Sequence, residues 1–236
     1  MTLDNKVILI TGGSKGIGYG IAASLVRENV RVVVTSRTQH AAEEAADRLN
    51  KIRPGSALGL VADVRDLNAQ ILVVKQILEK WGQLDVVVAN AGIGHFGSIE
   101  TLTPEQWQET IDINLTGVYN SIKPAIEPLK KTKGYIITIA SLAGTNFFAG
   151  GSAYNASKFG LVGFTQAIMM DLRQYGIKVT TIMPGSVATE FSGAHSNKDE
   201  SWKIQPEDIG QMVVDLLKMN PRTLPSKIEV RPSVPK

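Results

Sequence analysis

The sequence predicts an α/β protein, with residues 1–236 forming one domain built on a doubly wound parallel sheet of about seven strands covered by helices on both faces. Short runs rich in Val and Ile alternate with helical patterns along most of the 236 residues. Most of these runs are apolar at consecutive positions, which is typical of strands buried on both faces. Because strand, helix and strand repeat in this way, right-handed crossovers and a parallel sheet are expected.

The strands and helices are expected in a fixed order. The strand candidates are the segments 6–11, 31–36, 57–62, 84–90, 134–140, 178–183 and 227–232. Helical patterns cover 40–52 and 69–81, and further helices are expected from Gly16 and around Tyr154. In such a sheet, ligands bind outside the carboxyl ends of the strands, near the point where the strand order reverses. The residues that follow each strand are therefore the candidates for function.

The composition excludes several classes of function. No run of Lys or Arg accompanies the net charge of +3, so no nucleic-acid partner is predicted. The chain has no Cys, and His40, His95 and His195 lack metal-ligand spacing, so no metal site is predicted. We find no signal-peptide pattern and no apolar run of the ~20 residues that span a bilayer. Taken with the lack of Cys, this favours a cytoplasmic protein without a membrane partner.

The first strand is followed by a glycine-rich segment, TGGSKGIG, at residues 11–18. Glycines there allow a tight turn and a close approach of backbone to a phosphate, and the helix starting near Gly16 would direct its N-terminal N–H groups at the anion. Glycine clusters also occur in ordinary turns, but the position after the first strand and before a helix favours a dinucleotide site. The candidates are Thr11, Gly12, Ser14, Lys15, Gly16, Ile17 and Gly18.

The second strand is followed by Ser36, Arg37 and Thr38, with no acidic residue among them. An acid at this place would bond the 2′-hydroxyl of NAD and repel a 2′-phosphate, whereas guanidinium and hydroxyl groups suit a phosphate. Lys15 could approach from the other side. NADP(H) is therefore favoured over NAD(H), the alternative being a solvated arginine at the tip of a loop.

Other strands end in residues suited to the rest of a dinucleotide. Asp63 after the third strand could accept from the adenine amino group, although Asp is also a common turn residue. Small residues follow the fourth strand, where the cofactor's ribose must pass, and a Pro-Gly turn follows the sixth. The further cofactor candidates are Val64, Asn90, Ala91, Gly92, Pro184, Gly185, Val187 and Thr189.

Tyr154 and Lys158 share one helix face because they are four residues apart. A surface Tyr–Lys pair is one interpretation of this spacing; a phenol whose pKa is set by a neighbouring ammonium is the other. Their helix follows the fifth strand, so Tyr154, Lys158 and Ser141 are expected on the ligand side of the sheet. A hydroxyl, a phenol and an ammonium would then converge beside a nicotinamide.

These residues resemble the short-chain dehydrogenase/reductase family over nearly the whole chain. The motifs are TGGSKGIG, ANAG, Asn114 in DINLTG, Ser141, YNASK and PGSVAT, in the order and spacing of the family. The resemblance implies a Rossmann-type fold and hydride transfer between a nicotinamide and a carbonyl carbon, as in 3-oxoacyl reductases and carbonyl reductases. It also implies that Asn114, Ser141, Tyr154 and Lys158 form a catalytic tetrad.

The resemblance gives each member of the tetrad a role. Reduction of a ketone needs a proton and hydrogen-bond donors at the oxygen, and a free phenol near pKa 10 is a poor acid at neutral pH. The ammonium of Lys158 is expected to lower the pKa of Tyr154, the general acid in reduction and base in oxidation. Lys158 would also hold the nicotinamide ribose, Ser141 would donate to the substrate oxygen, and Asn114, expected in the middle of a long helix, would hold a water. The small residues between Tyr154 and Lys158 would leave room for the cofactor or pack within the helix.

Three features depart from the family pattern. Ala89 stands where many members have a second asparagine. The segment 191–204, expected to form the substrate lid, is short, so the site would be rather open or closed by few groups. The ending KIEVRPSVPK lacks the glycine found in many members, which makes a tetramer less secure and leaves a dimer through the long helices plausible. A homo-oligomer, tetramer or dimer, is expected.

The leading hypothesis is an NADP(H)-dependent oxidoreductase acting on the carbonyl or secondary alcohol of a small molecule. The alternative of another class is a catalytically silent dinucleotide-binding regulator on the same fold. The sequence leaves the direction of reaction and the substrate open among an acyl-carrier thioester, a free ketone, a sugar and a steroid. Aromatic and apolar side chains that could line the substrate pocket, or serve only packing or subunit contacts, are His95, Phe96, Leu142, Phe147, Phe148, Phe191 and Trp202.

Overall fold

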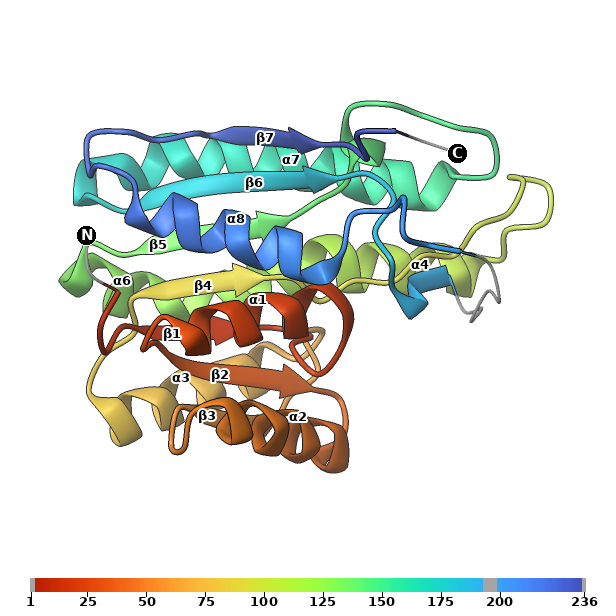
Figure 1. Ribbon diagram of the computed structural model, residues 1–236. Helices are drawn as coiled ribbons and strands as arrows, with labels where there is room; N and C mark the ends of the chain where they lie inside the picture. Colours follow the sequence, from red (N-terminus) through yellow and green to blue (C-terminus); the bar gives the residue numbers. More distant parts are fainter. Residues whose placement is uncertain (1–2, 193–198, 235–236) are drawn as a thin grey trace.

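Seven parallel strands form one sheet in the order β3-β2-β1-β4-β5-β6-β7 in the computed structural model, which describes residues 3–192 and 199–234 (Figure 1). The strands are β1 (Val7–Ile10), β2 (Arg31–Ser36), β3 (Ala57–Val61), β4 (Val86–Ala89), β5 (Tyr135–Ile139), β6 (Lys178–Pro184) and β7 (Lys227–Val230). From β1 the chain moves outward to β3 and then returns to β4 on the other side of β1. The order therefore reverses between β1 and β4, which confirms the predicted doubly wound sheet.

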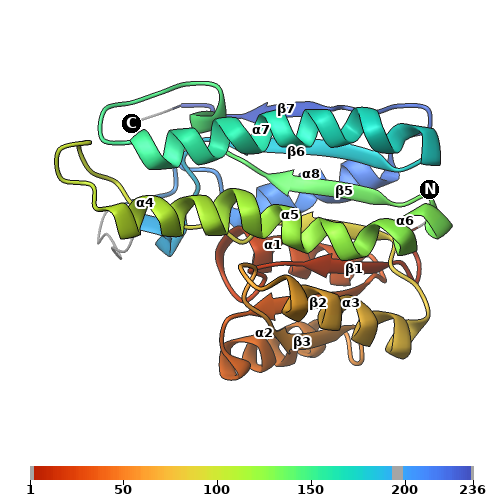
Figure 2. The same cartoon turned by 180° about the vertical axis from the view of Figure 1, so that it is seen from behind.

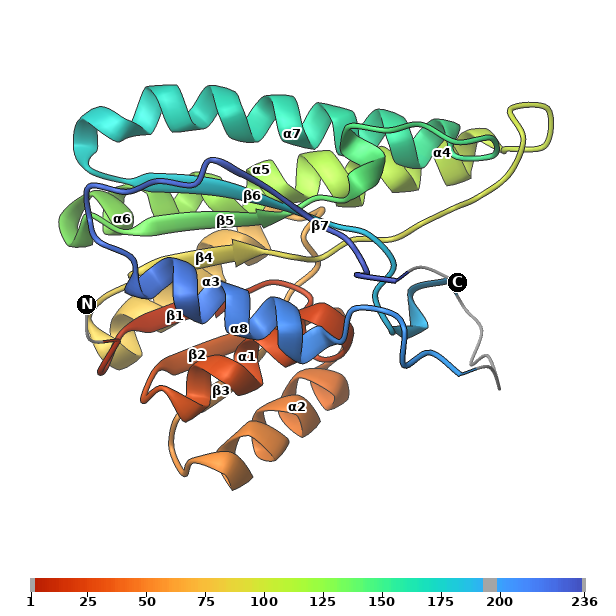
Figure 3. The same cartoon turned by 45° about the horizontal axis from the view of Figure 1, so that its top comes forward.

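Helices cover both faces of the sheet. They are α1 (Gly16–Arg27), α2 (Gln39–Ile52), α3 (Leu67–Trp81), α4 (Pro104–Ile111), α5 (Gly117–Ile122), α6 (Ile126–Thr132), α7 (Ser152–Leu172) and α8 (Pro206–Lys218). Short helical turns are η1 (Asp112–Thr116), η2 (Lys123–Ala125), η3 (Leu142–Gly144), η4 (Arg173–Tyr175) and η5 (Glu190–Ser192). Helices α1, α2 and α8 lie on one face (Figures 1 and 3), and α3 to α7 lie on the other (Figure 2).

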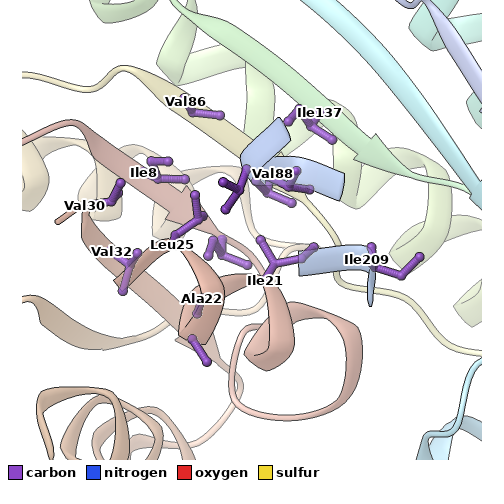
Figure 4. Packing of buried hydrophobic residues seen from close by; sticks show 14 of the residues in the cluster. Ile8, Ile21, Ala22, Leu25, Val30, Val32, Val86, Val88, Ile137 and Ile209 are labelled. Atoms are coloured by element: carbon purple, nitrogen blue, oxygen red, sulfur yellow. The ribbon is translucent and has the colours of Figure 1, made fainter. Parts of the chain in front are cut away.

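Strands β1 to β6 contribute side chains to two hydrophobic clusters, one on either face, whereas β7 contributes to one of them. In β1, Ile8 and Ile10 pack toward α1 and α8, as Figure 4 shows for Ile8, whereas Val7 and Leu9 pack toward α3, α5 and α7. Successive side chains of a strand point to opposite faces, and both faces here are covered. This is why the strands are apolar at consecutive positions. The two clusters stabilise the sheet through its two faces, so the ends of the strands are not needed for this packing.

The expected long helix around Asn114 is an interrupted one. Helix α4 passes into a π-helical turn, η1 (Asp112–Thr116), before α5 begins at Gly117. Single π-helical turns inside helices are rare, and those that occur are often found at functional sites. The wider turn displaces the backbone. Asn114 therefore lies within a widened turn rather than in a regular α-helix, and it is completely buried.

Candidate active site

A cleft of about 990 Å³ lies at the carboxyl ends of the strands. The loops after β1 to β6 all contribute to its lining. Nearly all the predicted site residues line it, including Ser141, Tyr154 and Lys158. The exceptions are Thr11, Gly18, Thr38 and Asn114, which lie behind the lining or beside it. No group of three metal-ligating side chains is found among residues 3–192 and 199–234.

The glycine-rich loop after β1 is fixed by the loop after β4. Gly12 has a positive φ of 62°, and a Cβ atom there would lie 2.9 Å from Cα of Ala91. Asn90 donates through Nδ2 to the carbonyl oxygens of Thr11 (3.0 Å) and Gly12 (3.1 Å). The Thr11 hydroxyl in turn accepts from the backbone N–H groups of Asn90 and Ala91. Thr11 and Asn90 therefore shape the loop, and Thr11 does so from behind, which accounts for its absence from the lining.

Helix α1 begins in the cleft and its amino end is suited to an anion. Gly16 and Ile17 line the cleft, no side chain caps the helix, and its first turn contains no acidic residue. The first N–H groups of a helix have no partner within the helix and carry a partial positive charge. This cradle, closed to side chains at Gly12, fits the pyrophosphate of a dinucleotide.

The end of β2 differs in part from the sequence prediction. Ser36 and Arg37 line the cleft, and the Ser36 hydroxyl lies 3.5 Å from that of Ser14. Thr38 instead caps α2, where its Oγ1 accepts from the N–H of Ala41 (3.4 Å). Lys15 lines the cleft, but its ammonium lies 3.3 Å from a Glu190 carboxylate oxygen rather than beside Arg37. The cation that the structure places at this end is Arg37.

Sequence reasoning missed two side chains that support the loops of this end. The guanidinium of Arg48 donates to the Ser14 carbonyl (2.9 Å) and lies 4.3 Å from the centre of the Tyr19 ring. Asn120 in α5 donates to the carbonyls of Val64 (2.9 Å) and Arg65 (3.1 Å). Both side chains contact residues far away in the sequence, so no local sequence pattern predicted these contacts.

Asp63 lies in the cleft at the end of β3, with its carboxylate held by Arg65. The guanidinium of Arg65 donates to it over 2.6–3.1 Å. This hydrogen bonding keeps the pKa of Asp63 below its usual value, despite partial burial. Asp63 is therefore a charged acceptor with a fixed orientation.

Tyr154 and Lys158 occupy the first turns of α7, facing the end of β5. Tyr154 is 9% exposed and Lys158 is 4% exposed. The Lys158 ammonium donates to the Ile139 carbonyl (3.1 Å) and lies 5.7 Å from the centre of the Tyr154 ring. The Ser141 hydroxyl accepts from the Ala143 N–H (3.1 Å). The three side chains are thus brought together in the cleft, as predicted, and the surface-pair interpretation is excluded by their burial.

The prediction that the Lys158 ammonium lowers the pKa of Tyr154 is wrong. Burial raises the pKa of the Tyr154 phenol, and a hydrogen bond with Ser141 only partly opposes this. Burial also lowers the pKa of Lys158 from 10.5 to about 8. Loss of hydration disfavours the charged form of each group, and the ammonium is directed at a carbonyl rather than at the phenol oxygen. Lys158 nevertheless remains mostly charged at pH 7.

Asn114 supports this group from behind. Its Oδ1 accepts from the Ile93 N–H (2.8 Å), and its Nδ2 donates to the Ile93 carbonyl (2.9 Å) and the Ser157 hydroxyl (3.0 Å). A Cβ atom at Gly92 would lie 3.3 Å from Asn114 Oδ1 and 3.6 Å from Lys158 Nζ, so both groups border the same small space. The π-helical turn thus ties the loop after β4 to α7.

The residues between Tyr154 and Lys158 form hydrogen bonds with neighbouring segments, in addition to leaving room for a cofactor. Asn155, 8% exposed, donates through Nδ2 to the carbonyls of Ala143 (2.7 Å) and Asn146 (2.8 Å). Ser157 donates to the Tyr154 carbonyl and accepts from Asn114. Asn155 therefore fixes the loop between β5 and α7, a role that the sequence pattern did not reveal.

The expected substrate-pocket residues divide into two groups. Phe96, Leu142, Phe147, Phe148 and Phe191 line the cleft near Tyr154. His95 and Trp202 do not, and His95 instead lies 2.8 Å from the carboxylate of Glu109. In the expected lid, 191–204, residues 193–198, including His195, lie outside the described residues.

Comparison with known proteins agrees with the fold and the cleft. The family model for short chain dehydrogenases matches residues 6–200. The 3-oxoacyl-[acyl-carrier-protein] reductase of Salmonella typhimurium is 32% identical over 84% of this chain and 80% of its own. An alcohol dehydrogenase from Thermococcus sibiricus, solved with 5-hydroxy-NADP, is 28% identical with a TM-score of 0.92 over 99% of both chains. A 3-ketoacyl reductase from Brucella melitensis, solved with NADH, is 26% identical with a TM-score of 0.90 over 98% of both.

The chain belongs to the short-chain dehydrogenase family. It is therefore an oxidoreductase that acts by hydride transfer, and its fold is one that binds a nicotinamide dinucleotide. No helix within residues 3–192 and 199–234 has the length and apolar character to cross a membrane.

Proposed function

We propose that the chain is an NADP(H)-dependent oxidoreductase that moves a hydride between the nicotinamide and the carbonyl or secondary alcohol carbon of a small molecule, with Tyr154 as general acid and base. The observation that carries this proposal is the convergence of Ser141, Tyr154 and Lys158 in one cleft, between the glycine-rich loop and an apolar wall. A silent regulator would have no need to bury an ammonium beside a phenol, since burial of a charge is costly.

The chain's own residues would handle the proton and the developing charge. A bound NADPH supplies the hydride. The raised pKa keeps the Tyr154 phenol protonated at neutral pH, which is the form that donates to a carbonyl oxygen during reduction. The Ser141 hydroxyl would donate a second hydrogen bond to that oxygen. The Lys158 ammonium would stabilise the phenolate left behind, and in the oxidative direction the same groups would work in reverse.

The test of this proposal is to titrate the purified protein with NADPH and NADH and then to follow nicotinamide absorbance with a panel of ketones. Tight NADPH binding with oxidation of the nucleotide by ketones is the expected result. Tight binding without turnover of any carbonyl compound in the panel would contradict the reductase and favour the silent regulator.

Arg37 supports the preference for NADP(H). It lines the cleft at the end of β2, where the segment 36–38 contains no acidic residue to repel a 2′-phosphate. Arg37→Asp removes a charge-assisted bond of roughly 1.5–3 kcal/mol, so NADPH affinity should fall on the order of 10- to 100-fold while NADH affinity changes little. The matched control is Arg173→Asp, an exposed arginine just before β6, at the opposite edge of the sheet. Equal losses for the two nucleotides would show that this interpretation is wrong.

A homo-oligomer is the assembly that the surface supports. Large apolar side chains are exposed on helices of one face, namely Trp107 (40%) on α4, Tyr119 (44%) on α5 and Phe159 (43%) on α7. These helices lie together in Figure 2. Such exposure is typical of contact surfaces, and a two-fold axis would bring the same helices of two copies together. Sedimentation equilibrium should give the mass of a dimer or tetramer, and a monomer would contradict it.

A further inference from the structure

Three phenylalanines from three separate segments line the cleft, two of them against Tyr154 and the third against one of these two. We name Phe96, Phe148 and Phe191 the phenylalanine cluster. Phe96 comes from the segment between β4 and α4, Phe148 from the loop between η3 and α7, and Phe191 from η5. The Phe96 and Phe191 ring centres lie 5.3 and 5.8 Å from that of Tyr154, and Phe148 lies 6.1 Å from Phe96. These are the spacings of tilted aromatic pairs in direct contact.

The rings of the cluster are about half exposed although they are apolar. Phe96, Phe148 and Phe191 are 49%, 48% and 42% exposed, whereas the Tyr154 they surround is 9% exposed. All three line the cleft. Apolar surface gathered in one concave place, with a polar group at its centre, is typical of a site that a ligand covers.

The backbone provides space for each ring. A Cβ atom at Gly94 would lie 2.6 Å from Phe96 and 2.8 Å from Phe191, so both rings rest on this glycine. A Cβ atom at Gly151 would lie 2.7 Å from Phe148. Asn155 also accepts from the Phe148 N–H (3.4 Å) while it holds the loop before it. The arrangement of the rings therefore depends on the absence of side chains at Gly94 and Gly151.

Three of the cations that line the cleft form ion pairs with carboxylates. Lys15, Lys203 and Arg231 line the cleft, and each lies within 3.3 Å of a carboxylate, from Glu190, Glu200 and Glu229 respectively. In the part of the chain that the structure describes, this rim offers paired charges rather than a basic patch. An acidic carrier protein would be attracted by a basic patch, and a neutral small molecule has no need of one.

We propose that the substrate of the reaction proposed above is a free, uncharged ketone, or the corresponding alcohol, with an aryl ring directly beside its carbonyl carbon. The inference rests on the proposed function, because it takes Tyr154 as the group that contacts the reacting oxygen. The rings that touch Tyr154 lie where they would contact the part of a substrate close to that oxygen. Aromatic rings favour a flat apolar partner in tilted or offset contact. A carrier-bound 3-oxoacyl chain would place a flexible methylene and a thioester there instead.

The test compares kcat/KM for phenyl methyl ketone, 2-butanone and the acetoacetyl thioester of N-acetylcysteamine, with NADPH in excess. The ratio of the phenyl ketone to 2-butanone cancels changes that affect all ketones alike. We expect this ratio to fall on the order of 10-fold in Phe96→Ala and in Phe191→Ala, because kcat/KM for the phenyl ketone should fall more than kcat/KM for 2-butanone. Tyr175→Ala is the matched control, since its ring is 45% exposed on η4 and lies outside the cleft lining.

Several results would overturn the inference. One is a ratio that changes no more in the cluster variants than in Tyr175→Ala, and another is a thioester that outperforms the phenyl ketone. Phe96→Leu keeps an apolar side chain of similar volume, so it reports on the ring if the alanine variant fails to fold. If no ketone is reduced at all, the proposed function fails, and calorimetric binding of phenyl methyl ketone to the NADPH complex still decides. Weaker binding in Phe96→Ala supports the ring site, and equal binding contradicts it.

Discussion

The amino ends and the carboxyl ends of the parallel strands use polar groups in opposite ways. We call these two sides of the sheet the amino edge and the carboxyl edge. At the amino edge, the Asp85 carboxylate accepts from Lys6 Nζ (2.7 Å), the Val7 N–H (2.9 Å) and Gln83 Nε2 (2.8 Å), and Asp85 is 4% exposed. At the carboxyl edge, the amino end of α1 has no capping side chain, and the buried Lys158 ammonium donates to the Ile139 carbonyl (3.1 Å). The same strands thus end in a closed network on one side and in a cleft on the other.

This difference separates stability from function. A buried polar group that is fully hydrogen-bonded contributes to folding, and removing one partner leaves others unsatisfied. Polar groups that face a cleft are stabilised by the ligand they bind. Without the ligand, their burial lowers the free energy of unfolding. Substitutions at the amino edge should therefore change the free energy of unfolding, and those at the carboxyl edge should change binding or turnover.

The largest change in stability is expected for Asp85→Ala. Removing this carboxylate leaves the buried Val7 N–H without its acceptor and breaks an ion pair whose carboxylate is buried and whose ammonium is half-exposed, at a cost of about 3 kcal/mol in the free energy of unfolding. Urea unfolding measures this change. Lys6→Met, which removes a half-exposed partner and leaves the carboxylate its other donors, should cost less. NADPH affinity of the folded variants should stay as in the parent, and a large loss of affinity would break the separation of the two edges.

A smaller change in stability is expected from the titration of Lys158. Its pKa is about 8 in the folded chain and 10.5 in the reference state, so the unfolded chain binds more protons between these values. Stability should therefore rise with pH, by ~2 kcal/mol between pH 7 and pH 10, out of ~3 kcal/mol for the full shift. The raised pKa of Tyr154 lies above this window, so the phenol contributes little within it.

The measurement for Lys158 is urea unfolding at pH 7 and pH 10 in the parent and in Lys158→Met. The variant should be the more stable protein at pH 7, and most of the gain between pH 7 and pH 10 should vanish. An equal gain with pH in both proteins would mean that other groups cause it. Such a result would remove the evidence that the carboxyl edge bears a cost in stability.

The sequence was sufficient for the features that depend on local pattern. Consecutive apolar residues such as Val86–Ala89 predicted strands covered on both faces, and every predicted strand is present. Glycines after β1 and the i, i+4 spacing of Tyr154 and Lys158 placed these groups at one edge, because parallel strands share their carboxyl edge. The cleft follows from the topology, so its lining was largely predictable.

Features that depend on contacts distant in the sequence were not predictable. The support of the glycine-rich loop by Arg48 and the pairing of Lys15 with Glu190 join residues far apart in the chain. The direction of the Tyr154 pKa depends on how deeply the phenol is buried, which no spacing reveals. Thr38 belongs to a helix cap because of its backbone position, although its residue type also suits a phosphate.

The central claim is that Tyr154 transfers the proton, and Tyr154→Phe tests it most directly. The substitution keeps the ring contacts with Phe96 and Phe191 and removes only the hydroxyl. With the best ketone of the panel, single-turnover reduction should slow by about 10²–10⁴-fold, while the Kd for NADPH and the free energy of unfolding stay close to those of the parent. A variant that binds NADPH and reduces the ketone at the parent rate would contradict the account.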